Sequence, residues 1–268
     1  MKTANLLKKY SIKLKKSLSQ NFLSDERVAR RIVEAAGIGQ GNVIVEIGAG
    51  AGTLTEEIAK VASKVYAIEI DERLKDLLEE RLKGYRNVQL IFEDFLKLDL
   101  SFLEDGFSYV ANIPYKITGR IIEKILKEGR FEKAILMVQK EVAQRILSEP
   151  GKRSYGYLTV LVKSFCNVEK LFDVSKSHFL PNPEVDSTVI KITFKGYDMD
   201  FESYKKFVSA IFSSKRKTIK NNLKSIAACP EALLEKANID PKKRAEQLSI
   251  GDIKRLYLAL SEERDMNV

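Results

Sequence analysis

Three glycines at every second position, Gly48, Gly50 and Gly52, are the first residues whose spacing suggests chemistry. They follow the apolar run Val43–Ile47 and precede a helical pattern over 53–62. Glycine allows a sharp turn between a strand and a helix, and it lets a ligand lie directly against the main chain. In open α/β sheets, ligands bind at the carboxyl ends of the strands. This turn is therefore a candidate binding site.

The spacing of the glycines narrows the class of ligand. A dinucleotide fingerprint requires glycine where Thr53 stands, and a P-loop requires a lysine that this run lacks. The order acid-x-Gly-x-Gly-x-Gly, which begins at Glu46, instead resembles motif I of class I methyltransferases, which bind S-adenosylmethionine (SAM). That ligand carries an amino-acid end and a sulfonium, and it has no phosphate. The alternative is a glycine-rich turn that binds no ligand.

Acidic residues follow the next two predicted strands. Glu69 ends the second strand, where a carboxylate can accept hydrogen bonds from the hydroxyls of a ribose. Asp94 follows the third strand, and in the methyltransferase family this position meets the adenine amine; Glu93 beside it competes for that role. The alternative for Glu69 is a solvent-facing position at the end of a strand.

The tetrapeptide Asn112-Ile113-Pro114-Tyr115 follows the fourth predicted strand. It resembles the Asn/Asp-Pro-Pro-Tyr/Phe motif of enzymes that methylate exocyclic amino groups of bases, with Ile113 in place of the first proline. In this interpretation the side-chain oxygen of Asn112 and the backbone carbonyl of Ile113 accept the two N6–H bonds of an adenine, which favours a tetrahedral nitrogen with a lone pair. Pro114 fixes the turn, and Tyr115 offers a ring face for stacking. The alternative is a proline turn with a buried tyrosine.

A second aromatic residue, Phe179, opens the segment Phe179–Pro183, which contains two prolines. If its ring faces Tyr115, a flipped adenine can lie between the two rings; the alternative is a hydrophobic plug. His178, the only histidine in the chain, precedes it. We assign His178 a structural role, because the proposed chemistry has no step that requires a strong base.

Strands and helices that alternate along the chain must position these residues. Strands are predicted at 43–47, 64–70, 88–92, 109–111, 133–138, 158–165 and 188–194, and helices at 26–36, 53–62, 72–83, 119–128 and 140–148. Such alternation indicates an α/β fold with a mostly parallel sheet covered on both faces. After Lys195 only helices are predicted, at 201–213, 215–227, 231–237 and 245–261. We therefore expect a catalytic domain over 1–195 that includes a basic N-terminal arm, and a helical RNA-binding domain over 196–268.

The net charge of +9 is concentrated in two segments that contain no acid. Residues 1–24 carry six lysines, and residues 203–230 carry seven cations. This distribution favours a polyanionic partner such as nucleic acid; the alternative is a set of solvated helix faces. The cations expected to bind RNA phosphates are Lys13, Lys15, Lys16, Lys215, Arg216, Lys217 and Lys220.

Composition argues against several other classes of protein. No apolar run is long enough to cross a membrane, and the N-terminus lacks the apolar region of a secretory signal, so we expect a cytoplasmic protein. Cys166 and Cys229 stand far apart and, with one histidine, cannot form a usual zinc site. No metal is therefore expected.

Taken together, the motifs resemble the KsgA (RsmA) family of small-subunit rRNA adenine N6,N6-dimethyltransferases over nearly the whole chain. The matching segments are Gln20–Leu23, Glu46–Gly52, Asn112–Tyr115, Phe179–Pro183 with Val185–Ser187, Lys215–Leu223 and Arg244–Ser249. The resemblance implies a Rossmann-like class I methyltransferase fold, with a seven-stranded, mostly parallel sheet whose last strand is reversed, followed by a small all-helical C-terminal domain.

The same resemblance implies an activity and its partners. SAM is the implied methyl donor, S-adenosylhomocysteine its product, and two adjacent adenosines in the loop of the 3′-terminal hairpin of 16S rRNA, in the immature 30S subunit, are dimethylated. The family's SAM contacts correspond to Asn21, Leu23, Gly48, Glu69, Asp94 and Asn112, to which we add Gly50 of the same turn.

Two alternatives to this function remain open. The Erm group, which methylates a 23S rRNA adenine and confers macrolide resistance, shares the catalytic motifs, but Lys215–Leu223 and Arg244–Ser249 match the KsgA family. The second alternative is a non-catalytic RNA-binding assembly factor, and the intact Glu69, Asp94 and Asn112 argue against it. Nothing in the sequence requires a dimer, so we expect a monomer.

Overall fold

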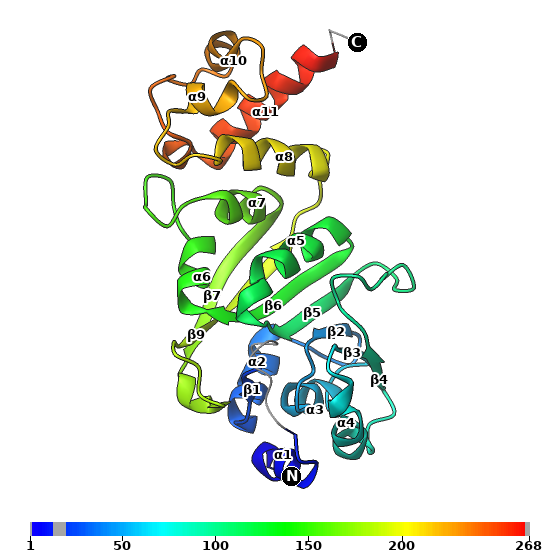
Figure 1. Ribbon diagram of the computed structural model, residues 1–268. Coiled ribbons are helices and arrows are strands. Elements are labelled where there is room, and N and C mark those ends of the chain that lie inside the picture. Colours follow the sequence, from blue (N-terminus) through cyan, green and yellow to red (C-terminus); the bar gives the residue numbers. More distant parts are fainter. Residues whose placement is uncertain (1, 13–19, 266–268) are drawn as a thin grey trace. The chain divides into compact units, whose positions relative to one another are not determined.

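The computed structural model describes residues 2–12 and 20–265. Its main sheet has seven strands in the order β4-β3-β2-β5-β6-β9-β7 (Figure 1). The strands are β2 (Val43–Ile47), β3 (Lys64–Glu69), β4 (Val88–Phe92), β5 (Phe107–Asn112), β6 (Phe131–Gln139), β7 (Cys166–Val174) and β9 (Ser187–Phe194). β2 pairs in parallel with β3 and β5, while β9 runs antiparallel to β6. The predicted α/β class, with a mostly parallel sheet and a reversed last strand, is confirmed.

The parallel pairing brings the carboxyl ends of neighbouring strands to one edge of the sheet. Val45 of β2 lies opposite Tyr66 of β3 and Tyr109 of β5, and Ile68 of β3 lies opposite Ile91 of β4. The chain therefore leaves β2, β3, β4 and β5 at the same edge. The glycine turn, Glu69, Asp94 and Asn112 are gathered there although up to 64 residues separate them in the sequence.

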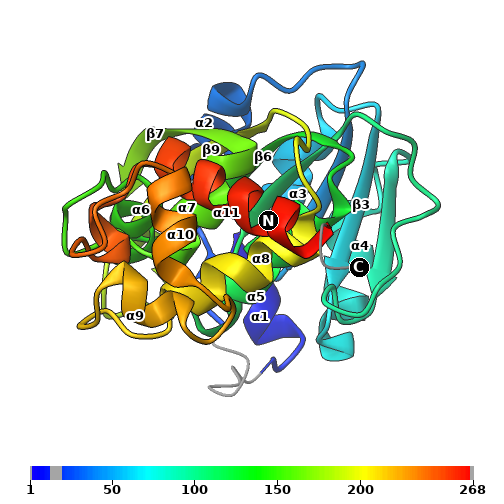
Figure 2. The same ribbon diagram turned by 90° about the horizontal axis from the view of Figure 1, so that it is seen from above.

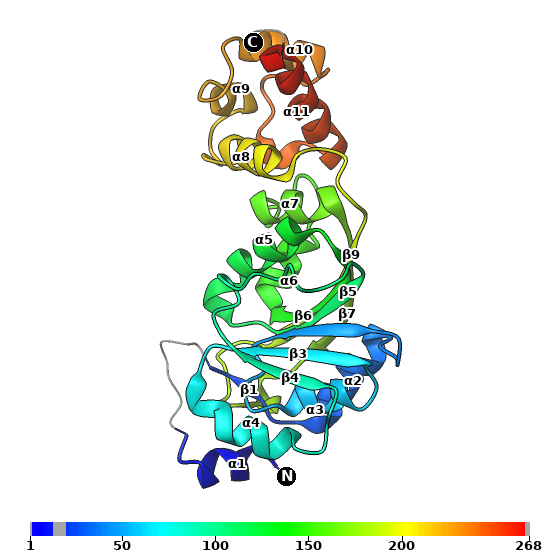
Figure 3. The same cartoon turned by 90° about the vertical axis from the view of Figure 1, so that its right-hand side faces the viewer.

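Helices cover both faces of the sheet, as Figure 3 shows, with α1–α4 on one side and α5 on the other. They are α1 (Thr3–Lys9), α2 (Glu26–Ala36), α3 (Thr53–Ala59), α4 (Lys75–Leu82, after the 3-10 turn η2 at Glu72–Leu74) and α5 (Thr118–Glu128, after η3 at Tyr115–Ile117). α2 begins where Asp25 accepts a hydrogen bond from the backbone N–H of Arg27, and it ends at Gly37 in the left-handed conformation. Both ends follow the usual capping chemistry.

A second, two-stranded sheet joins distant parts of the sequence. β1 (Phe22–Leu23) pairs antiparallel with β8 (Phe179–Leu180), which follows the turn η4 (Lys176–His178). Phe22, Leu23 and Phe179 enter the core that α1–α4 form with the main sheet. This pairing fixes the segment after residue 20 beside the carboxyl edge of the main sheet.

The chain divides into two compact units, of which the second contains Gln144–Asn167 and Lys195–Val268. Its helices are the end of α6 (Lys140–Ile146), α7 (Tyr157–Phe165), α8 (Phe201–Ile211), α9 (Ile219–Leu223), α10 (Pro230–Lys236) and α11 (Ile250–Asp265), with the 3-10 turn η5 (Ala245–Gln247). Figure 2 shows α8–α11 grouped together. In this unit the buried Tyr204 packs edge-on against Phe165 of α7 and Tyr257 of α11, and its hydroxyl is 2.7 Å from Ser164 Oγ.

Three predicted elements differ from the structure. Residues 158–165, predicted as a strand, form α7, and the strand that completes the sheet is β7 immediately after it. The apolar, partly β-branched run is consistent with either element, and burial of Phe165 among the aromatic rings of the second unit favours the helix.

Consequently residues 144–167 pack with the helical unit, and the domain boundary predicted at 195/196 captures only the later part of that unit. The predicted helices at 215–227 and 245–261 are shorter or displaced, as α9 and α11.

No helix within the described ranges is long and apolar enough to span a membrane.

Candidate active site

A cleft opens where the chain leaves β2, β3, β4 and β5, and it contains about 960 Å³ free of protein atoms, part of it open to solvent. This size suits a small-molecule ligand. Its lining residues include four carboxylates, Glu46, Glu69, Glu93 and Asp94, and no Lys, Arg or His. An acidic cleft repels a phosphate-bearing ligand and favours a cationic one.

The glycine turn forms the floor of this cleft at the junction of β2 and α3. Gly50 has φ of +57°, and a Cβ built there would lie 2.9 Å from the ring of Phe22. Gly52, with φ of +78°, would place a Cβ 3.0 Å from Leu78. Any other residue would therefore be strained in backbone and in space. The backbone N–H groups of Gly48 and Ala49 donate to the carbonyl of Ile68, which fastens the turn to β3.

Glu69 fastens the same turn from the end of β3. Its two carboxylate oxygens accept the backbone N–H groups of Gly50 (2.8 Å) and Asp71 (2.9 Å). Each oxygen keeps a further lone pair. The side chain lines the cleft and is 7% exposed, and this burial raises the pKa of Glu69. Glu69 can thus hold the turn and accept hydrogen bonds from a ligand at the same time.

Glu46 was noted in the sequence only as the acid that opens the glycine motif, yet it also lines the cleft. The residue is 1% exposed, and within the described residues nothing hydrogen-bonds its Oε2. Burial raises the pKa of Glu46 to about 8. A buried polar atom without a partner is costly, so a ligand group that hydrogen-bonds to Glu46 would relieve this cost.

The two acids after β4 both line the cleft, and the structure distinguishes them by their surroundings. Asp94 is half-buried, and its Oδ1 accepts from the backbone N–H of Leu96 at 2.9 Å. Glu93 is exposed. The fixed side chain of Asp94 is better oriented to recognise an amine than the exposed Glu93.

Asn112, Ile113, Pro114 and Tyr115 all line the cleft, directly after β5. The Nδ2 group of Asn112 donates to the backbone carbonyl of Asn21 at 3.0 Å. The oxygen of the same amide, Oδ1, therefore remains as an acceptor. In the described part of the chain, neither Oδ1 of Asn112 nor the carbonyl of Ile113 accepts a hydrogen bond. The hydroxyl of Tyr115 lies 2.8 Å from Ser187 Oγ, which tethers the ring. The site thus offers two acceptors beside one aromatic ring.

The segment Gln20–Leu23 also lines the cleft, and the ring of Phe22 lies against Gly50 of the glycine turn. Gln20, Asn21 and Leu23 line the cleft, and the side-chain amide of Gln20 donates to Asp71 at 2.7 Å. Hydrogen bonds from Arg73, and from Gln20, lower the pKa of Asp71 to about 2, so this anchor is charged at neutral pH. All seven residues expected to contact the cofactor are therefore in one cleft.

Comparison with known proteins assigns the chain to a family. The family model described as "Ribosomal RNA adenine dimethylase" matches residues 11–262. A ribosomal RNA small subunit methyltransferase A from Thermotoga petrophila is 55% identical over 257 residues, 96% of this chain and 95% of its own length. The chain belongs to the ribosomal RNA adenine dimethylase family. The resemblance inferred from the motifs is confirmed.

Solved structures agree with this family assignment. A dimethyladenosine transferase from Plasmodium falciparum is similar with a TM-score of 0.81 and 30% identity, over 91% of this chain and 98% of that one. The 23S rRNA methyltransferase ErmE gives a TM-score of 0.70 and 28% identity, over 90% and 100%. The small subunit methyltransferase A from Thermotoga petrophila is thus 55% identical to this chain, whereas ErmE is 28% identical.

Phe179 of this adenine dimethylase does not line the cleft as the structure has it. The residue is 1% exposed and sits in the core with Phe22 and Leu23. Its neighbour His178 directs Nδ1 to Asp25 at 2.9 Å, and Ser24 donates its backbone N–H to the carbonyl of His178. Stacking of a base on Phe179 would therefore require this segment to move.

The basic residues fall into three groups. Lys13, Lys15 and Lys16 lie outside the described residues. Lys215, Arg216 and Lys217 are exposed in the loop between α8 and α9. Lys220 is half-buried and forms an ion pair with Glu231 at 2.6 Å, so its charge is already partly neutralised.

Two positioning residues were not identified from the sequence. Arg81 of α4, with a side chain 2% exposed, donates to the carbonyl of Ala51 in the glycine turn and to Thr3 Oγ1 of α1, and it pairs with Glu56 at 2.8 Å. Asn222 of α9 is buried and donates to the carbonyls at 211 and 214, which anchors the basic loop. The sequence pattern does not reveal either role, because each depends on carbonyls brought close by the fold.

Proposed function

We propose that this chain transfers methyl groups from SAM to N6 of two adjacent adenosines in the loop of the 3′-terminal hairpin of 16S rRNA. The observation that carries the proposal is the pair of acceptors at Asn112 and Ile113, set beside the ring of Tyr115 in the cleft. Relatives named ribosomal RNA small subunit methyltransferase A support the small subunit as target. The lower identity to ErmE makes a 23S rRNA target the weaker candidate.

The cleft fits SAM by its chemistry. The glycine turn allows a ligand to approach the main chain closely. The lining has four acidic side chains and no cation, which suits a ligand that carries a sulfonium and an ammonium. Oε2 of Glu46 has no hydrogen-bond partner among the described residues and is available to the ligand. Glu69 is placed to hold the ribose hydroxyls and Asp94 to accept from the adenine amine. When bound, SAM supplies an electrophilic methyl group.

The protein's part in the reaction is to prepare the target nitrogen. The lone pair of an adenine N6 is delocalised into the ring, so the amine is a poor nucleophile. Oδ1 of Asn112 and the carbonyl of Ile113 accept hydrogen bonds from the two N–H groups of this amine. They thereby orient the nitrogen as a tetrahedral nucleophile with a free lone pair. These acceptors are fixed before the base arrives, so little reorganisation is needed when positive charge develops on the nitrogen. Tyr115 stacks against the base.

No strong base is required, because the methylated amine becomes acidic and releases its proton afterwards. His178 is not among the residues that line the cleft, and its Nδ1 is engaged with Asp25. We place the reaction in the cytoplasm, on the immature 30S subunit, with the enzyme acting as a monomer and without a metal. In the described residues, no cluster of three or more His, Cys, Asp or Glu side chains is arranged to bind a metal ion.

The test is to offer labelled SAM with immature 30S particles and with 23S rRNA in parallel. We expect label to enter the 30S particles only. Transfer to 23S rRNA alone would favour the Erm-type activity, and binding of both RNAs without any transfer would favour an assembly factor. Asn112→Ala in the same assay should bind 30S particles but transfer far more slowly.

A further inference from the structure

The acidic cleft creates an electrostatic problem for an RNA substrate. Four acidic side chains line the cleft, of which Glu93 is exposed and Asp94 half-buried, and the lining contains no cation. An RNA strand carries a negative phosphate at every nucleotide, and these charges are repelled by the cleft. A cation at the rim would offset the repulsion without entering the cofactor site.

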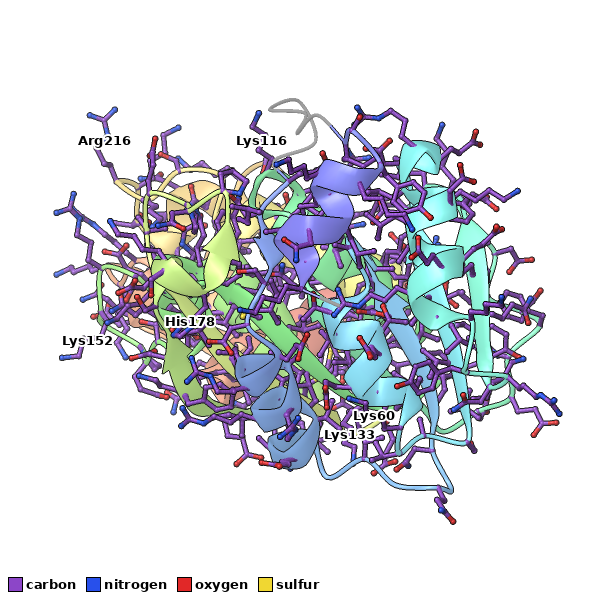
Figure 4. The ribbon with its side chains drawn as sticks, turned by 90° about the horizontal axis from the view of Figure 1, so that it is seen from below. Lys60, Lys116, Lys133, Lys152, His178 and Arg216 are labelled. Atoms are coloured by element: carbon purple, nitrogen blue, oxygen red, sulfur yellow. The ribbon has the colours of Figure 1, made fainter. Side chains whose placement is uncertain are left out.

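Lys116 is placed at that rim. It stands between Tyr115 and Ile117, both of which line the cleft, but it is itself exposed and is not part of the lining. All three belong to the 3-10 turn η3, in which successive side chains point in different directions. In Figure 4 the labelled Lys116 projects outward from the edge of the ribbon.

The charge of Lys116 is available for a ligand. Among the described residues it has no ion pair and no side-chain hydrogen bond, and residues 13–19 contain no acid that could neutralise it. Lys60 and Lys133, which Figure 4 shows at the opposite end of the view from Lys116, are instead paired with Glu57 (2.6 Å) and Glu132 (3.8 Å). The next helix, α5, begins two residues after Lys116, so the positive end of its dipole faces the same edge.

We propose that Lys116 binds the phosphate of the target nucleotide, or of the nucleotide next to it, and so positions the adenine beside Asn112. In a nucleotide the ribose separates the base from its phosphate. When the base lies between the acceptors and the ring of Tyr115, its phosphate must therefore lie outside the cleft, near the residue that follows Tyr115. This inference rests on the proposed function and adds to it a positioning residue for the RNA backbone.

The experiment compares Lys116→Ala and Lys116→Arg with Lys83→Ala as the matched control. Lys83 is exposed, belongs to the same unit, and has no ion pair among the described residues. It follows the end of α4 and precedes β4, so it lies at the amino edge of the sheet, away from the cleft. Affinity for unmethylated 30S particles is measured at several salt concentrations, together with SAM affinity and the dependence of the methylation rate on particle concentration.

Loss of one phosphate contact should flatten the slope of log K against log salt by about 0.7–0.9. Between 50 and 200 mM salt, the wild type should then lose about threefold more affinity than Lys116→Ala. The half-saturating particle concentration should rise while SAM affinity and the rate at saturation stay near wild type, and Lys116→Arg should restore both the slope and the half-saturation.

Equal slopes for Lys116→Ala and Lys83→Ala would overturn the inference. Reduced SAM affinity in Lys116→Ala would also overturn it, because it would show a structural effect on the cleft. Failure of the proposed function is recognised separately, since the wild type itself would then not methylate the particles, whereas the binding slopes could still be compared.

Discussion

The side-chain amide of Asn112 donates a hydrogen bond to the backbone carbonyl of Asn21 across 3.0 Å, although 91 residues separate them in the sequence. A carbonyl can only accept, so this bond assigns Nδ2 of Asn112 to Asn21 and leaves Oδ1 for a substrate amine. The bond also ties the end of β5 to the Gln20–Leu23 segment, which lines the same cleft. The proposed catalytic acceptor is thus oriented by a residue that also lines the cleft.

Replacing Asn112 by Ala should slow the chemical step. An acceptor to a nitrogen that becomes cationic is worth about 1.5–3 kcal/mol, so single-turnover methyl transfer should fall by roughly tenfold to more than a hundredfold. Affinity for RNA should change little, while SAM affinity should fall modestly through Asn21. Asn87→Ala is a suitable control, since Asn87 also donates its amide to two backbone carbonyls but stands before β4, outside the cleft lining. A single-turnover rate in Asn112→Ala equal to that of Asn87→Ala would remove Asn112 from the chemistry.

Replacing Glu69 by Ala should weaken cofactor binding. The substitution removes the proposed ribose acceptor and also releases the backbone N–H of Gly50. We expect a loss of about 1.5–3 kcal/mol in SAM affinity by calorimetry, with RNA affinity nearly unchanged. Unaltered SAM affinity would show that Glu69 supports only the turn.

Glu46 should make the stability of the protein depend on pH. Its folded pKa of about 8 lies above its ordinary value of 4.5. For a raised pKa, the stabilising contribution is complete below the unfolded value and is lost as the pH rises through the folded value. The groups that act on Glu46 electrostatically are Glu69, which raises its pKa, and Arg81, which lowers it.

Glu46→Gln, which cannot ionise, should therefore gain on the wild type as the pH rises. The difference in unfolding free energy should grow by about 1.4 kcal/mol per pH unit between roughly pH 5 and pH 8, measured without cofactor by denaturant titration. Glu69 titrates in both proteins and is coupled to Glu46, so the difference between the two curves reports Glu46 together with this coupling. Parallel curves for the two proteins would mean that Glu46 is ionised in the fold.

The exposed loop between α8 and α9 should supply RNA contacts. Replacing Lys215, Arg216 and Lys217 by Ala should flatten log K against log salt by about two to three units if all three touch phosphate. SAM binding should survive, because the cleft proposed to bind SAM is lined only by residues of the first compact unit. Lys220→Ala is an informative comparison, since Glu231 already neutralises that lysine. A triple variant with the wild-type slope would leave these cations as solvated surface.

Elements with a clear local pattern could be predicted from the sequence. The alternation of strands and helices alone predicts one cleft for the glycine turn, the acids at strand ends and the Asn112–Tyr115 turn. The reason is that parallel strands bring their carboxyl ends together. α7 could not be identified, because an apolar run of this length has no diagnostic period, and its partners Tyr204 and Tyr257 are distant in the sequence.

Contacts between residues that are far apart in the sequence could not be predicted from the sequence pattern either. The burial of Phe179 follows from the pairing of β8 with β1, and the neutralisation of Lys220 follows from the approach of α10 to α9. Whether Phe179 stacks on a base remains a proposal that requires its segment to move out of the core.

The most direct test of the central claim is to identify the methylated nucleoside and its position. Unmethylated 30S particles are incubated with SAM and the purified protein, and their RNA is digested and analysed by mass spectrometry. We predict N6,N6-dimethyladenosine at two adjacent positions in the loop of the 3′-terminal hairpin of 16S rRNA, and none with Asn112→Ala. Absence of dimethyladenosine there, or methylation confined to another RNA, would contradict the account.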